Sequence, residues 1–171
     1  MYSQSRNYQP LLRALIMLFL LMGSSLSVAA GLTDMGGKPM AIEDFTGKGK
    51  WTVVMFWSSD CHVCNAEAHE YVALQARRPD IQMLGLTLDG AANKADALAF
   101  IKEHKLNFPN LIGEPETIAG LYYELTGGFW VGTPTFMVFN PKGVLNAADA
   151  GAIPPNLIEE FIDNNTVASS D

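Results

Sequence analysis

Two cysteines separated by two residues, Cys61 and Cys64, are the side chains in this sequence best suited to chemistry. A thiolate attacks a disulfide, and a second thiol nearby displaces the mixed disulfide that results. Residues 52–57 carry no charge and are largely β-branched or aromatic, which predicts a buried strand. Residues 58–60 interrupt this run, and the alanine-rich stretch from His62 onward predicts a helix. Cys61 therefore falls at a helix N-terminus, with Cys64 one turn further along.

This placement assigns different roles to the two thiols. The unpaired N–H groups at a helix start favour negative charge, so Cys61 is expected to be the nucleophilic thiolate. Cys64 is expected to resolve the mixed disulfide from a more buried position. One alternative is half of a zinc site, completed by His62, His69 or nearby carboxylates, and another is an inert structural bridge. The strand-to-helix setting favours redox chemistry over zinc, and a bridge that closes so short a loop stabilises little.

The sequence around the cysteines resembles the thioredoxin superfamily, in particular its TlpA/ResA-like (DsbE/CcmG-like) periplasmic disulfide reductases, which include the cytochrome c maturation thioredoxins. Residues 56–64, FWSSDCHVC, are similar to the FW-x-x-W-C-x-x-C of that family. Glu67 stands where the family has a glutamate, and residues 132–136, GTPTF, resemble its cis-proline loop. The resemblance covers about residues 37–162, and it implies a thioredoxin-like α/β fold: a central mixed sheet flanked by helices, with the redoxin/TlpA-type central insert.

The rest of the chain predicts the elements that must position this site. Strands are expected at residues 52–57, 81–88, 106–112, 135–139 and 144–148, and a small edge strand or hairpin at residues 40–42. Helices are expected from residue 62 to about 78, at 93–104, from 115 to about 126 and from 154 onward. The alternation of strand and helix in the first half predicts parallel strands with right-handed crossovers.

Glu67 is a candidate for proton transfer. It lies three residues past Cys64, so the two side chains share one helix face that is expected to point under the sheet. A carboxyl held there with little water can pass a proton to or from Cys64 during exchange. Thioredoxin itself uses an aspartate on the preceding strand, and Met55 stands at that position here. The alternative is a solvated helix glutamate without a role.

The segment around Pro134 is expected to dock the substrate. The resemblance implies a cis Thr133–Pro134 bond that faces the cysteines and leaves the Thr133 backbone free to pair with an extended substrate segment. A trans turn proline is the alternative. Trp57 is expected to pack beside the cysteines and to contribute to substrate binding. Phe129 and Trp130, just before the loop, form either a substrate-facing patch or a plug in the core.

Two residues that flank Cys61 leave the direction of electron flow open. His62, if protonated, lowers the pKa of the Cys61 thiol, which stabilises the reduced form and makes the pair more oxidising. His62 is also expected to contact the substrate. Asp60 acts in the opposite direction and stands where the related reductases have tryptophan.

The N-terminal 30 residues predict a secretory signal peptide. Arg6 and Arg13 precede an apolar run at residues 14–22, and small residues end at Ala29 and Ala30. An uncleaved anchor is the alternative. Residues 31–171 are expected to form one thioredoxin-like domain. Without the leader, 9 Lys and Arg face 18 Asp and Glu, an acidic balance that repels nucleic acid.

These features predict an exported thiol:disulfide oxidoreductase that reduces disulfides in periplasmic proteins, with apocytochrome c as a candidate substrate. The resemblance implies a membrane thiol donor of the DsbD or CcdA type and no prosthetic group, and membrane contact only through an uncleaved leader. One alternative is a thiol oxidase or isomerase of secreted proteins. Another is a module whose cysteines bind a soft ion such as Cu(I). A peroxidase is disfavoured, because Ser58 replaces the threonine of the peroxiredoxin Thr-x-x-Cys motif.

Overall fold

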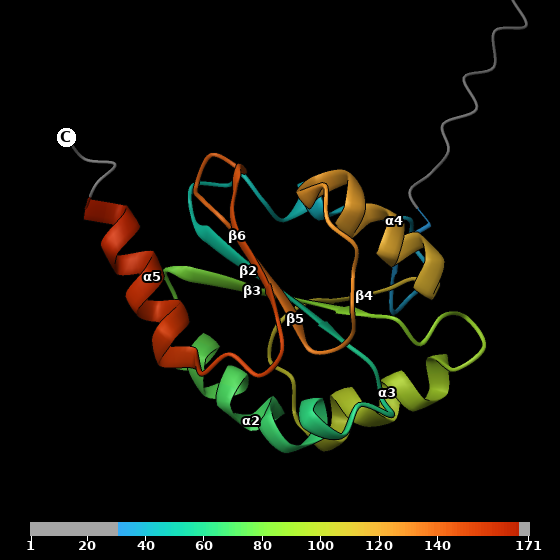
Figure 1. The fold of residues 1–171 in the computed structure, drawn as a ribbon. Helices are drawn as coiled ribbons and strands as arrows, with labels where there is room; N and C mark the ends of the chain where they lie inside the picture. Colours follow the sequence, from blue (N-terminus) through green and yellow to red (C-terminus); the bar gives the residue numbers. More distant parts are fainter. Residues whose placement is uncertain (1–30, 168–171) are drawn as a thin grey trace, which may run out of the picture.

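The site is built on strand β2 (Trp51–Trp57), in which all seven residues are buried. The computed structural model describes residues 31–167, so the expected leader lies outside the described residues. The strands form one mixed sheet in the order β1-β4-β3-β2-β5-β6 (Figure 1). The other strands are β1 (Thr33–Asp34), β3 (Ile81–Thr87), β4 (Asn110–Ile112), β5 (Thr135–Phe139) and β6 (Leu145–Ala150). The helices are α2 (His62–Arg77), α3 (Lys94–Glu103), α4 (Pro115–Thr126) and α5 (Pro155–Val167).

The pairing of the strands confirms the predicted mixed sheet. β2 runs parallel to β3 and antiparallel to β5, and β3 runs parallel to β4. The short β1 and the last strand β6 add antiparallel edges. β2 therefore has a hydrogen-bonded neighbour on each side, and its carboxyl end delivers the chain to Cys61.

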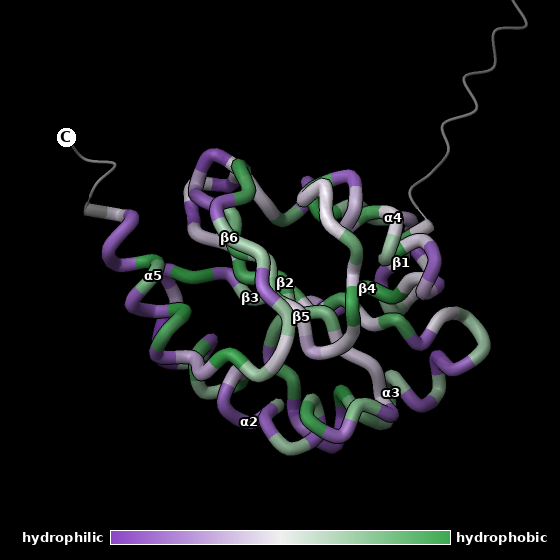
Figure 2. Tube along the Cα trace, in the orientation of Figure 1, coloured by the Kyte–Doolittle hydropathy of each residue, from purple (hydrophilic) through white to green (hydrophobic). Residues whose placement is uncertain are grey.

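Helices cover both faces of the sheet (Figure 1). Val53, Met55 and Trp57 of β2 pack with residues of α2, α3 and α5 on one face. Val54 and Phe56 pack on the other face, together with residues of α4 and of the N-terminal segment. Apolar residues are concentrated in the central strands, and the helices alternate polar and apolar residues (Figure 2). This two-sided burial explains why the β2 sequence is continuously apolar.

Two sequence expectations about strands are wrong. Residues 106–112 contain only the three-residue strand β4, because the Leu106 N–H is bonded to the Ile101 carbonyl oxygen of α3 and Pro109 has no N–H for a ladder. Residues 40–42 form no strand. A 3₁₀ turn spans Ile42–Asp44 instead, and the Asp44 carboxylate accepts a hydrogen bond from the Ala41 N–H at 2.9 Å.

The remaining elements match their predicted positions within a few residues. Gly127 ends α4 with a φ of 72°, a left-handed conformation that glycine adopts without strain. Within residues 31–167, the structure contains no helix with the length and apolarity that crossing a membrane would require.

Candidate functional site

Cys61 and Cys64 are joined by a disulfide at the start of α2, with their Cα atoms 5.2 Å apart. Cys61 is the N-cap residue of the helix, and its Sγ accepts a hydrogen bond from the Cys64 N–H at 3.1 Å. Cys61 is partly exposed, whereas Cys64 is fully buried. An incoming sulfur can therefore approach Cys61 but not Cys64. The Cys64 N–H is one of the unpaired donors of the first helical turn, and its hydrogen bond to Sγ favours a negative charge on the Cys61 sulfur.

A buried carboxylate anchors the loop that leads into Cys61. Asp89, which follows β3 and is only 9% exposed, accepts hydrogen bonds from the Ser59 N–H at 3.1 Å and the Ser59 hydroxyl at 2.8 Å. The Thr87 hydroxyl donates to the same carboxylate at 2.6 Å. In the sequence, Asp89 is distinguished only by its place just after the apolar run of β3. Its contact with the loop depends on β2 and β3 being neighbours, which the local sequence does not show.

A second anchor comes from Asn65 on α2. Its amide nitrogen donates to the carbonyl oxygens of Ser59 and Cys61, both at 3.0 Å. Nε2 of His104, at the end of α3, lies 3.1 Å from the Asn65 amide oxygen and is assigned as the donor to it. Residues on α2, α3 and the end of β3 thus fix the backbone around the exposed sulfur.

Trp57 is a packing residue and presents no surface to a substrate. Its side chain is fully buried, its indole N–H donates to Asn110 Oδ1 at 3.1 Å, and its ring stacks on Phe100 with centroids 4.4 Å apart. The expectation that Trp57 packs near the cysteines is confirmed. The expectation that it contacts substrate is wrong, because the inward face of β2 places the indole under α3.

Glu67 lies on α2 one turn past Cys64 and is partly buried. Its Oε2 is 3.3 Å from the hydroxyl of Tyr71, which is also 3.0 Å from the carbonyl oxygen of Ile153. Met55, which stands where thioredoxin has an aspartate, is a buried apolar residue of the core. Glu67 is thus the carboxyl that follows Cys64 on this helix face, and a buried tyrosine fixes its position.

The proline loop lies beside the cysteine loop. The Thr133–Pro134 bond is cis, and Pro134 is buried with its carbonyl oxygen accepting from the Gly151 N–H at 2.8 Å. Phe56 of β2 pairs with Thr135 of β5, so the chain leaves β2 toward Cys61 at the same end of the sheet where the proline loop enters β5. The loop and the residues before Cys61 therefore form neighbouring edges.

Phe129 and Trp130 point in different directions. Phe129 is 85% exposed and the nearby Val131 is 79% exposed, so both face solvent. Trp130 is partly buried and lines a cavity of about 460 Å³ together with residues 58–60. Phe129 therefore does not plug the core, and Trp130, between these two exposed residues, is the one that lies beside the cysteine loop.

His62 and His69 are surface residues of α2. His62 is exposed directly after Cys61, and His69 contacts the Ala66 carbonyl oxygen through Nδ1 at 3.1 Å. Asp60 is also exposed, and its carboxylate accepts a hydrogen bond from the Ser58 hydroxyl at 2.6 Å. Among residues 31–167, no group of three or more His, Cys, Asp and Glu side chains is arranged to hold a metal ion.

The mixed sheet has the strand order of a thioredoxin-like fold, and the Cys-x-x-Cys disulfide lies at the N-terminus of the helix that follows its central strand. Together these features define a thiol:disulfide oxidoreductase with a thioredoxin-like fold. The chain belongs to the AhpC/TSA family, whose sequence model matches residues 27–148. The match includes both cysteines, Glu67 and the proline loop.

The chain is also similar to individual known proteins. The chain is 24% identical over 117 residues to sporulation thiol-disulfide oxidoreductase A of Bacillus subtilis, an alignment that covers 67% of each chain. It is 31% identical over 107 residues to the soluble secreted antigen MPT53 of Mycobacterium tuberculosis, covering 57% of this chain and 58% of that protein. A solved secreted disulfide oxidoreductase from M. tuberculosis, homologous to E. coli DsbE, superimposes with a TM-score of 0.58 at 22% identity, covering 81% of this chain and 98% of the other.

Proposed function

We propose that this protein is an exported disulfide reductase that acts on protein substrates in the periplasm. The observation that carries this proposal is the unequal exposure of the two sulfurs: Cys61 is open to a partner, and Cys64 is sealed beneath it. Export is supported by the leader-like N-terminal sequence and by relatives described as secreted.

The proposed cycle uses both thiols in turn. The Cys61 thiolate attacks a substrate disulfide, forms a mixed disulfide and releases one substrate thiolate. Glu67 then takes the proton of Cys64, and the Cys64 thiolate attacks Cys61 Sγ. The second substrate thiolate leaves, and the bridge between Cys61 and Cys64 that the structure contains is formed. Two electrons from a membrane thiol donor of the DsbD or CcdA type restore the dithiol.

Substrate docking is assigned to the proline loop. Thr133 precedes β5 at the end of the sheet where β2 leads into the cysteine loop, and its backbone can pair there with an extended chain. Phe129 and Val131 offer an exposed apolar surface in the same segment. An unfolded protein that carries a disulfide, such as apocytochrome c, has both the extended backbone and the apolar side chains that this edge requires.

A thiol oxidase or isomerase is the second candidate, and the exposed His62 beside Cys61 favours it. A protonated imidazole stabilises the Cys61 thiolate and so raises the reduction potential of the pair. Equilibration with a thiol of known potential separates the candidates. A value near about −270 mV supports a reductase, and one near about −120 mV supports an oxidase.

The substrate and the direction of transfer are tested by trapping partners in the native host. The Cys64→Ser variant retains the attacking thiol but cannot resolve the mixed disulfide, so partners should accumulate on Cys61 as adducts that dithiothreitol releases. The Cys61→Ser variant is the matched control and should trap none of them. If both variants recover the same proteins, attack through Cys61 is refuted.

The Glu67→Gln variant is expected to reduce disulfides about 100-fold more slowly at neutral pH, because Cys64 loses its proton acceptor. The pH profile of the resolving step should also lose its acid limb. Stopped-flow measurement of thiol release from a mixed disulfide on Cys61 checks both expectations. Glu70→Gln, an exposed neighbour on the same helix, is the control. An unchanged profile in Glu67→Gln would remove Glu67 from the mechanism.

A further inference from the structure

Tyr71 lies on α2, seven residues past Cys64, and belongs to the same core cluster as that cysteine. Its side chain is 1% exposed, and its ring packs against Phe136 with centroids 4.9 Å apart. Its hydroxyl oxygen lies between two acceptors, 3.0 Å from the carbonyl oxygen of Ile153 and 3.3 Å from Oε2 of Glu67. A buried phenol usually finds one partner, and this one touches the carboxyl that follows Cys64 on α2.

One hydrogen must serve these two acceptors, because a phenol carries a single O–H. When Glu67 is protonated, its own O–H can donate to the Tyr71 oxygen while Tyr71 donates to Ile153. When Glu67 is ionised it can only accept, so the Tyr71 hydrogen turns to the carboxylate. The carbonyl of Ile153 belongs to a partly exposed residue and can then be hydrated.

We propose that Tyr71 is a positioning residue for Glu67: its hydroxyl holds the carboxylate one turn below Cys64 and favours the ionised form that accepts the thiol proton. The inference rests on the proposed role of Glu67 in disulfide exchange. A hydrogen bond to a charged acceptor is stronger than one to a neutral group, so Tyr71 stabilises the carboxylate more than the carboxylic acid. Within residues 31–167, the Glu67 carboxylate makes no other side-chain hydrogen bond and no ion pair.

The surroundings of Tyr71 support this assignment. Burial, and secondarily the charge of Glu67, raise the pKa of Tyr71 well above its ordinary value of 10, so the hydroxyl retains its hydrogen at neutral pH. The negative charge of Glu70, also on α2, raises the pKa of Tyr71 further. On the neighbouring helix α5, the carboxylate of Glu159 forms an ion pair with Arg77 at 2.8 Å.

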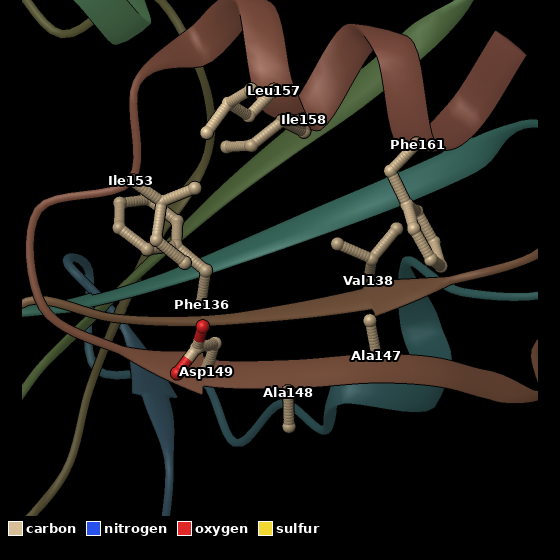
Figure 3. Close-up of a pocket in the computed structure, with 9 residues that line it drawn as sticks. All are labelled: Phe136, Val138, Ala147, Ala148, Asp149, Ile153, Leu157, Ile158 and Phe161. Carbon is tan, nitrogen blue, oxygen red and sulfur yellow. The ribbon is translucent and has the colours of Figure 1, made fainter.

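The second acceptor belongs to the segment between β6 and α5. Ile153 lines an apolar cavity of about 150 Å³ between this segment, α5 and the strands β5 and β6, into which Phe136 and Leu157 also project (Figure 3). Asp149 of β6 contributes the carboxylate at the rim of this cavity. No basic side chain lines this cavity.

The pH profile of the resolving step tests the proposal. In Tyr71→Phe, the midpoint of the acid limb should move upward by about 0.5 to 1 pH unit. The double variant Tyr71→Phe/Glu67→Gln should behave as Glu67→Gln alone, because Tyr71 acts through Glu67. Tyr122→Phe, a partly buried tyrosine on the opposite face of the sheet, should leave the midpoint in place. A loss of rate that is uniform across pH would indicate a structural role and overturn the proposal.

A second measurement separates this inference from the proposed function. The ¹³C signal of the Glu67 carboxyl group reports its titration whether or not the protein reduces a substrate, and its midpoint should rise in Tyr71→Phe. An unchanged or lower midpoint refutes the role of Tyr71. If Tyr71→Phe does not fold, the ring Cζ signal of Tyr71 in the unmodified protein should change at the midpoint of Glu67, and this change should vanish in Glu67→Gln. Failure of the proposed function would appear separately, as no disulfide reduction at any pH.

Discussion

Replacement of Cys61 by serine is expected to lower the rate of disulfide reduction by at least about 10³-fold, because a hydroxyl at neutral pH is neither ionised nor as nucleophilic as a thiolate. The partly exposed Sγ of Cys61 is the atom that a substrate sulfur can reach, and Cys64 is fully buried below it. Steady-state reduction of insulin, with dithiothreitol as the electron source, measures the loss.

The Cys64→Ser variant is the matched comparison for this effect. It should release one equivalent of thiol from a model disulfide at close to the normal rate and then stop, because the mixed disulfide on Cys61 cannot be resolved. The two variants therefore separate attack from resolution. If Cys61→Ser kept most of the activity, or if Cys64→Ser lost the first step, the assigned order of the thiols would be wrong.

Alanine at Gly85 is expected to destabilise the protein by about 3 kcal/mol, the largest effect on stability that we predict for a single added methyl group. A Cβ on this β3 residue would overlap the amide oxygen of Asn110 and lie 2.8 Å from Nε1 of Trp57. Asn110 would have to move, which breaks its 3.1 Å hydrogen bond with the Trp57 indole and leaves a buried N–H without a partner. Urea unfolding of the oxidised protein measures the change in free energy.

Gly120→Ala provides the control for this substitution. Gly120 lies in α4, and a Cβ there meets nothing within 4 Å. Alanine at this helical position should stabilise the protein by up to about 1 kcal/mol through its higher helix propensity. A loss smaller than about 1 kcal/mol in Gly85→Ala would show that Asn110 has room to relocate and that the contact beneath Trp57 is not tightly packed.

The sequence predicts those parts of the fold and the site that depend on neighbours along the chain. The apolar run of β2, the cysteine that caps the start of α2 and the end of α4 near residue 126 all follow from local composition and spacing. The residues between Leu106 and Asn110 did not form the strand expected of them, because Pro109 has no N–H and because the position of this segment is set by β3.

Several residues of the site depend on contacts between distant segments, which no local pattern reports. Asp89 reaches Ser59 because β2 and β3 are adjacent, and Tyr71 reaches Ile153 across 82 positions of sequence. Trp57 lies in the predicted strand, but its side chain packs in the core with Val53 and Met55, because side chains alternate between the two faces along β2. The alternation along a strand shows that it has two faces, but it does not show that helices cover both faces of β2 and keep a substrate from each.

The central place of β2 also bears on resistance to proteolysis. A protease cleaves segments that open locally, and the free energy of opening is highest for strands paired on both sides and buried on both faces. β2 meets both conditions, and its last residue, Trp57, is four positions from the reactive sulfur. The chain can therefore exchange electrons at an exposed sulfur without offering a cleavable segment on the strand that supports it.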